Sequence, residues 1–162
     1  MINIKKLDKG LDFLERVETL IAVIILISVI LINFLEIIGR YLFSRPLGWP
    51  HELSLYLIVW FAYFTLSILV KRGELIKMNF FYDKFSKTKR KIITLGYNIM
   101  LLITSILMIK YSFELEKVQR ARNLVTLNLP QAIGLYGFMI ALFSIIFIVS
   151  INIYKDVLEI YD

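Results

Sequence analysis

The protein has 162 residues, of which 59% are hydrophobic and 20% are charged, with a formal net charge of +6, one histidine and no cysteine. The mean hydropathy of +0.74 predicts a polytopic membrane protein. Contact with anionic lipid head groups and the positive-inside rule explain the net positive charge more simply than nucleic-acid binding does. The lack of cysteine excludes disulfides and thiolate sites, and the single histidine argues against a bis-histidine haem bundle, so we expect no cofactor.

Residues 1–16 predict a short amphipathic helix that lies on the membrane surface before the first span. One helical face is apolar and consists of Ile4, Leu7, Leu11 and Leu14. A cleaved signal peptide is the competing interpretation, but acidic residues precede the apolar run, the run is too long, and no A-x-A-like site follows it. We therefore expect the segment to be retained.

Four apolar runs follow, at about 17–38, 52–70, 92–113 and 132–154. Each is long enough to cross ~30 Å of hydrocarbon at ~1.5 Å per residue. The centre of every run lacks acidic residues, basic residues and histidine. The sequence therefore predicts one all-α membrane domain of four transmembrane helices, with a partner supplying any site for a polar solute.

The end of the first span carries a candidate ion pair. Glu36 precedes Arg40 by four residues, so both lie on one helical face near the membrane interface. Two independent charges at head-group level are the alternative. The following connector combines proline, glycine and aromatic residues, among them Tyr41 and Trp49, and we expect it to lie in the interface or against another protein.

The second span begins with Glu52 in its first turn, where the helix dipole favours negative charge, and carries an aromatic cluster that includes Trp60. A basic connector follows, and its aromatic residues predict a second interfacial segment. We expect its cations to contact lipid head groups: Lys71, Arg72, Lys77, Lys84, Lys87, Lys89, Arg90 and Lys91.

Polar residues of the third span, Asn98 and Ser105, are expected to face a neighbouring helix. Pro130 is placed at the first turn of the fourth span, where its missing N–H costs little. Three small residues of that span favour close approach of another helix: Gly134, Gly137 and Ala141.

The distribution of positive charge predicts the orientation. Thirteen of the 19 Lys and Arg residues lie in the N-terminal segment, the second connector or the tail. By the positive-inside rule, both termini are expected to be cytoplasmic.

No common catalytic motif occurs in the sequence, whether HExxH, GxSxG, a Walker motif or a carboxylate cluster. His51 beside Glu52 is a weak signal for a metal site or a proton relay, and an interfacial hydrogen-bonding histidine is the simpler interpretation. We therefore expect no enzymatic activity.

Several short patterns occur in order along the chain. An Arg-Tyr pair follows the first span at Arg40, and Trp49 precedes Glu52 in the connector. An aromatic second span around Trp60 then gives way to a basic turn, Lys71-Arg72-Gly73. The last connector contains Thr126, Leu127, Leu129 and Pro130.

This order resembles the small four-helix membrane subunit of tripartite ATP-independent periplasmic (TRAP) transporters over nearly the whole chain. The resemblance implies a sodium-driven importer of organic acids in the bacterial inner membrane, such as sialic acid or C4-dicarboxylates. Its partners would be a large elevator-type membrane subunit and a periplasmic substrate-binding protein. The chain departs from the family at two positions: it has Leu75 and Asn79 where family members commonly carry a histidine and an acidic residue.

Within that resemblance, we expect Glu36, Arg40, Trp49 and Glu52 to form an outer polar cluster that docks a partner. The main alternative is a small four-helix proton-coupled multidrug exporter that acts as a homodimer through Glu36. Against it, Glu36 lies at the end of a span rather than at its centre.

Overall fold

The structure, a computed structural model, describes residues 4–42, 44, 47–76 and 87–161. Four long helices account for most of them: α1 (Ile4–Leu42), α2 (Trp49–Arg72), α4 (Lys87–Arg120) and α5 (Ile133–Tyr161). A short 3-10 helix, η1 (Glu74–Ile76), follows α2. Each of the four long helices is long and apolar enough to cross a membrane, which confirms the predicted all-α fold with four spans.

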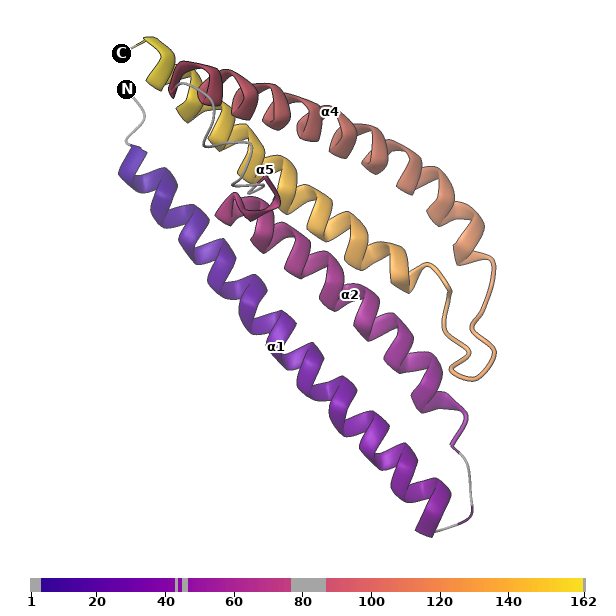
Figure 1. Cartoon of the computed structure of the whole chain (residues 1–162). Helices are drawn as coiled ribbons and strands as arrows, with labels where there is room; N and C mark the ends of the chain where they lie inside the picture. The colour runs from indigo at the N-terminus through magenta and orange to yellow at the C-terminus, as the bar shows by residue number, and fades with distance from the viewer. Residues whose placement is uncertain (1–3, 43, 45–46, 77–86, 162) are drawn as a thin grey trace.

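The four helices lie side by side in the order α1, α2, α5, α4 (Figure 1). Helix α5 is last in the chain but lies between α2 and α4, so α1 and α4 form the two edges. A four-helix bundle would enclose a core between its helices. A single layer instead leaves much of its two broad faces uncovered by the chain itself.

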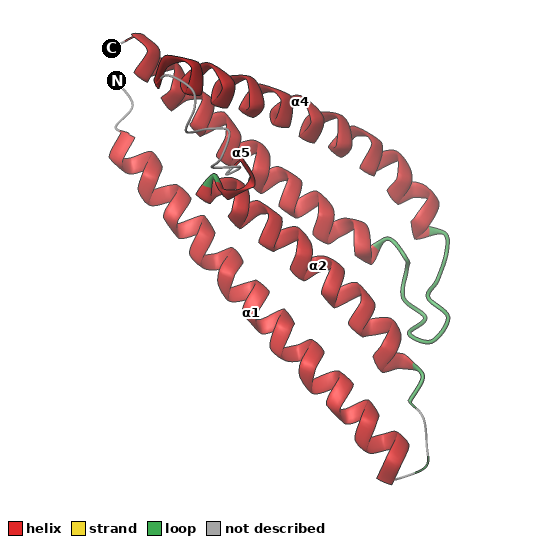
Figure 2. Cartoon of the chain, viewed as in Figure 1, coloured by secondary structure: helices red, strands yellow, loops and turns green. Residues whose placement is uncertain are grey.

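The two ends of this layer differ in what they carry (Figure 2). Helix α1 begins and α5 ends at one end, which we call the terminal end, and η1 also lies towards it. The α1–α2 and α4–α5 connectors lie at the opposite end, which we call the loop end. The first and last helices therefore start and finish on the same side, as four antiparallel spans require.

Helix α1 corrects one expectation from the sequence. Residues 4–16 do not form a separate short helix, because α1 continues through them into the first span. The amphipathic pattern is present, but Leu7, Leu11 and Leu14 pack against α2 and α5 rather than only facing a lipid surface. The reason is that these leucines have neighbouring helices to contact, and no residue between them breaks the helix.

Helix α2 has identifiable boundaries. Gly48 precedes it, and Pro50 stands at the start, where a missing N–H leaves no hydrogen bond broken. At its other end Gly73 adopts φ 64°, a left-handed conformation that favours glycine, and its N–H bonds to Val70 O at 3.1 Å. This cap stops the helix immediately after Lys71 and Arg72.

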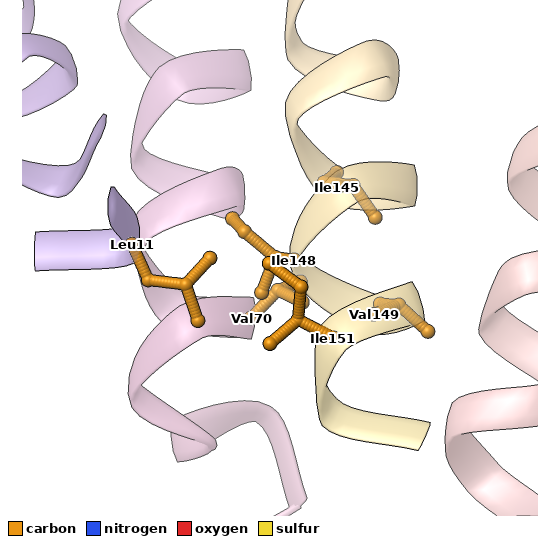
Figure 3. Close-up of a cluster of buried hydrophobic side chains, with 6 residues drawn as sticks. All are labelled: Leu11, Val70, Ile145, Ile148, Val149 and Ile151. Carbon is orange, nitrogen blue, oxygen red and sulfur yellow. The ribbon is translucent and has the colours of Figure 1, made fainter. Parts of the chain in front are cut away.

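Two apolar clusters hold the layer together. One joins α1, α2 and α5 towards the terminal end and includes Leu11, Val70 and Ile148 (Figure 3). The second joins α1 to α2 near the middle, where Phe64 packs on Ala22, Ile25 and Val29. Packing between the helices is thus concentrated around α2 and α5, the two central helices.

Candidate functional site

The edge helices α1 and α4 expose extensive apolar surface. Phe34 on α1 is 58% exposed and Met100 on α4 is 70% exposed, and many other large apolar side chains on these edge helices are similarly open. Apolar surface of this extent is stable only against lipid tails or another membrane protein. The layer therefore offers long apolar strips along α1 and α4.

At the loop end, Glu52 of α2 binds the connector between α4 and α5. Its carboxylate accepts the backbone N–H groups of Val125, Thr126 and Leu127, at 3.0, 2.9 and 3.2 Å. The Thr126 hydroxyl donates to the same carboxylate. Hydrogen bonds to a charged acceptor are stronger than neutral ones, so Glu52 fixes the α4–α5 connector against the first turn of α2.

Glu36 and Arg40 form the predicted ion pair on α1, with Arg40 Nη2 2.6 Å from Glu36 Oε1. They line a shallow groove together with Asn33 and Tyr41. Asn33 also joins the helices, because its Nδ2 donates to Ser54 Oγ of α2 at 3.0 Å. This asparagine was not singled out from the sequence.

The predicted outer cluster therefore occurs as two separate groups in the part of the chain that the structure describes. Glu36 pairs with Arg40, whereas Glu52 binds the α4–α5 connector. Trp49 begins α2 and is partly exposed. All four residues lie towards the loop end, and their joint role in docking stays a prediction.

Trp60 holds α2 against α5. Its indole Nε1 donates to the carbonyl of Ile133 at 3.0 Å. A Cβ at Gly137 would lie 2.7 Å from the Trp60 ring, and a Cβ at Gly134 would lie 3.0 Å from Tyr56. The expected close approach at these two glycines is confirmed, and the approaching helix is α2 of the same chain.

Pro130 lies earlier than predicted. Helix α5 begins at Ile133, so Pro130 stands three residues before it, in an isolated antiparallel bridge with Asn123. The bridging bonds run from Leu124 N–H to Leu129 O and from Gln131 N–H to Arg122 O. Neither bond needs an N–H from proline, so the bridge accommodates this residue.

At the terminal end, the first two basic residues of the second connector bind acids of α1. Lys71 Nζ lies 2.6 Å from Asp12 Oδ1 and 2.5 Å from Glu15 Oε2, and Arg72 Nε lies 2.7 Å from Glu15 Oε1. These cations therefore join α2 to α1, a role that the sequence interpretation missed. A contact with lipid head groups stays a prediction for them.

The other predicted lipid-facing cations are only partly described. Lys77 and Lys84 lie outside the described residues, as do Asn79 and most of the second predicted interfacial segment. Lys87, Lys89, Arg90 and Lys91 belong to the first turns of α4. Lys89 and Lys91 are exposed and Arg90 is half-buried.

Polar side chains of α4 form further contacts, some with α5 and others within α4 itself. Asn98 Nδ2 donates to Asp156 Oδ2 of α5 at 2.8 Å, which confirms that it faces a neighbouring helix. Ser105 is buried, but its hydroxyl donates to Leu101 O of its own helix. Towards the loop end, the Tyr136 hydroxyl donates to Glu116 Oε1 at 2.9 Å, and Arg120 Nε bonds to that oxygen at 2.7 Å.

The most important residue missed from the sequence is Glu18. It is only 3% exposed and lies between α1, α2 and α5, with Ser67 Oγ donating to its Oε1 at 3.0 Å. The sequence signal was its position at the start of an uninterrupted apolar run, on the face that carries Leu11 and Leu14. A carboxylate at the edge of a span is usually solvated, so this position does not stand out in the sequence.

His51 is exposed in the first turn of α2, beside Glu52. Over the described residues, the structure contains no group of three or more His, Cys, Asp or Glu side chains placed to hold a metal ion. At the loop end, the described polar contacts of Glu36 and Glu52 are made within this chain.

Comparison with known families decides the identity. The family model for the DctQ component of tripartite ATP-independent periplasmic transporters matches residues 29–159. The chain belongs to this family. The resemblance inferred from the sequence is thereby confirmed. No curated protein matches the chain.

Membership of the DctQ family establishes the general role. The protein is the small membrane component of a TRAP transporter, and it associates with the other components of a tripartite system. The family is one of transporter components and not of enzymes. Together with four membrane-capable helices, this makes it a multi-pass membrane protein.

The match to the family model covers some of the contacts described above and leaves out others. Residues 29–159 include the contact of Glu52 with the α4–α5 connector, the Glu36–Arg40 pair and the contact of Trp60 with Gly137. The acids of α1 that bind Lys71 and Arg72 precede residue 29, as does Glu18. Membership of the DctQ family therefore says nothing about these N-terminal contacts.

Proposed function

We propose that this DctQ component is the non-catalytic scaffold of a sodium-coupled importer of organic acids in the bacterial inner membrane. It holds the large elevator-type subunit and helps to receive the loaded substrate-binding protein. The observation that carries the proposal is the single layer of helices, whose edges α1 and α4 expose long apolar surfaces.

The shape of the layer supports a scaffolding role. A subunit that moves solute across the membrane needs a fixed neighbour to slide against. A layer of four helices resists tilting because α2 and α5 join its two halves, through Trp60 with Ile133 and through the apolar cluster around Ile148. The span centres carry no acidic residue, basic residue or histidine of the kind that binds ions and polar solutes at mid-membrane.

The charge distribution supports an orientation with both termini in the cytoplasm. The described parts of the basic connector, η1 after Arg72 and the start of α4 at Lys87, lie towards the terminal end together with the start of α1 and the end of α5 (Figure 1). The loop end then faces the periplasm, where Glu52 holds the α4–α5 connector and leaves Val125 93% exposed. This connector and the Glu36–Arg40 pair are the surface proposed to meet the binding protein.

Sialic acid and C4-dicarboxylates are the substrate classes that the family suggests. The small component is proposed not to contact the solute, so the choice between them belongs to its partners. The exporter alternative gains no support from the geometry, because Glu36 is engaged by Arg40 on its own helix.

Orientation is tested by labelling, which the absence of cysteine makes direct. Val125→Cys and Lys9→Cys variants are treated in intact cells with a membrane-impermeant maleimide. We expect Val125→Cys to react from outside and Lys9→Cys to react only after the membrane is permeabilised. The reverse pattern would overturn the proposed topology.

The scaffold role is tested with the partners present. We expect the protein to co-purify with the large membrane subunit, and a photo-crosslinking residue at Phe34 or Met100 to capture that subunit. A crosslinker at Phe64, which is buried between α1 and α2, is the control and should capture nothing. Isolation as a self-contained dimer that exchanges protons for cationic drugs would refute the scaffold role.

Transport itself gives the third test. In vesicles that contain all three components, sodium-dependent uptake of an organic acid should weaken in Arg40→Ala and Glu52→Ala variants. Unchanged uptake in both variants would remove these residues from the proposed receiving surface.

A further inference from the structure

Glu18 is a carboxyl group enclosed between three helices. It is 97% buried, since only 3% of its surface is exposed, and Ser67, which donates to its Oε1, is completely buried. The Ser144 hydroxyl of α5 lies beside the carboxyl as well. Even so, Oε2 has no hydrogen-bond partner of normal geometry among the described residues.

No basic residue of the described chain neutralises this carboxyl. On its own helix the nearest charged neighbour acting on it is another acid, Glu15. On α2 the nearest cations are Lys71 and Arg72, and both are bound to Glu15 or Asp12. Helix α5 carries no charged residue from Ile133 to Tyr154, so it presents only the hydroxyl of Ser144.

A buried carboxylate without a countercharge is costly, and in membrane proteins unpaired intramembrane carboxyl groups mark proton relays and ion pathways. We propose that Oε2 of Glu18 binds one monovalent cation, either a proton or Na⁺, at the junction of α1, α2 and α5. Ser67 and Ser144 supply the remaining oxygen contacts. The shared chemistry is a single positive charge on an otherwise unpaired carboxylate oxygen.

The site couples cation occupancy to helix packing. The carboxyl faces Ser67 of α2 and Ser144 of α5, one turn along from the cluster that contains Leu11, Val70 and Ile148. A bound cation neutralises the junction and stabilises α1 against the two central helices. Since Glu18 precedes the residues matched by the family, this site is a property of the chain and does not follow from family membership.

The test uses the full-length protein in lipid nanodiscs and two measurements. Infrared spectroscopy detects the carbonyl stretch of a protonated carboxylic acid, and thermal unfolding is followed in sodium or choline chloride at equal ionic strength. Glu18→Gln is compared with wild type in both. Glu114→Gln, at an exposed position of α4, is the matched control.

If the cation is a proton, wild type shows an acid carbonyl band that Glu18→Gln lacks, and sodium has no specific effect on unfolding. If it is Na⁺, sodium raises the unfolding temperature of wild type over that in choline, and Glu18→Gln abolishes the difference. Glu114→Gln behaves as wild type in either case. If wild type and Glu18→Gln agree in both measurements, Glu18 binds neither cation and the proposal is wrong.

A second variant keeps the test decisive if Glu18→Gln does not fold. Ser67→Ala retains the carboxyl but removes the donor to Oε1. We expect it to change the apparent affinity for the cation by roughly threefold to tenfold, as the loss of one hydrogen bond implies. An unchanged apparent affinity for the cation in Ser67→Ala would count against the assigned site.

Discussion

Glu52 accepts the backbone N–H of Thr126 at 2.9 Å, across 74 positions of sequence. The acid stands in the first turn of α2, and the threonine belongs to the connector between α4 and α5. One carboxylate therefore determines where an exposed connector lies relative to the central helices. The position of Val125, the most exposed large apolar residue of that connector, depends on this contact.

Replacing Glu52 with glutamine should loosen the α4–α5 connector without unfolding the helices. The amide has one acceptor oxygen and cannot serve all the N–H groups that now meet the carboxylate. We expect faster hydrogen exchange at residues 123–129, measured by mass spectrometry on the detergent-solubilised protein. Glu114→Gln should leave these rates unchanged. Equal exchange rates at residues 123–129 in Glu52→Gln and Glu114→Gln would show that Glu52 does not hold the connector.

Adding a methyl group at Gly137 should push α5 away from α2. A Cβ there would lie 2.7 Å from the Trp60 ring, and overpacking of this kind costs about 1–3 kcal/mol. Gly137→Ala should therefore lower the unfolding temperature. Gly96→Ala is the control, because a Cβ at Gly96 meets nothing within 4 Å. Alanine has a higher helix propensity than glycine, so this variant should be as stable as wild type or more stable.

A double-mutant cycle tests whether the Trp60 ring causes this loss of stability. If it does, Gly137→Ala should cost less stability in a Trp60→Leu background than in wild type. Strictly additive losses would show that the two positions do not contact each other.

The contact between Lys71 and Glu15 should be measurable as a coupling energy between α1 and α2. Their Nζ and Oε2 atoms lie 2.5 Å apart, and both side chains are largely covered. A double-mutant cycle with Lys71→Met and Glu15→Gln should give a coupling of roughly 0.5–1 kcal/mol that decreases as salt rises. A coupling of zero at low salt would mean that these charges face solvent or lipid instead.

Asn98 is predicted to hold the edge helix α4 in place. Its Nδ2 donates to Asp156 at 2.8 Å from a nearly buried position, so Asn98→Leu would leave that carboxylate without its donor. We expect a loss of about 1–3 kcal/mol in unfolding free energy. Thr104→Ala, at an exposed position of the same helix, should change stability by less than about 0.5 kcal/mol.

Several features of the site were accessible from the sequence because they depend on residues close together in the chain. The Glu36–Arg40 pair follows from four-residue spacing on one helix, and Gly137 was identified as a point of close approach from its small size. What Gly137 accommodates was not accessible, since Trp60 lies on another helix. The same limitation hid the acids of α1 that bind Lys71 and Arg72.

The sequence by itself determined four apolar helices, their approximate limits and the gathering of positive charge at one end, because hydropathy and charge are properties of each local segment. Only the tertiary structure decided that α5 lies between α2 and α4, that Glu52 binds residues 125–127, and that Glu18 is enclosed. Those outcomes depend on which helix faces fit together. That fit is decided by side chains such as Glu18 and Ser67, 49 positions apart in the chain.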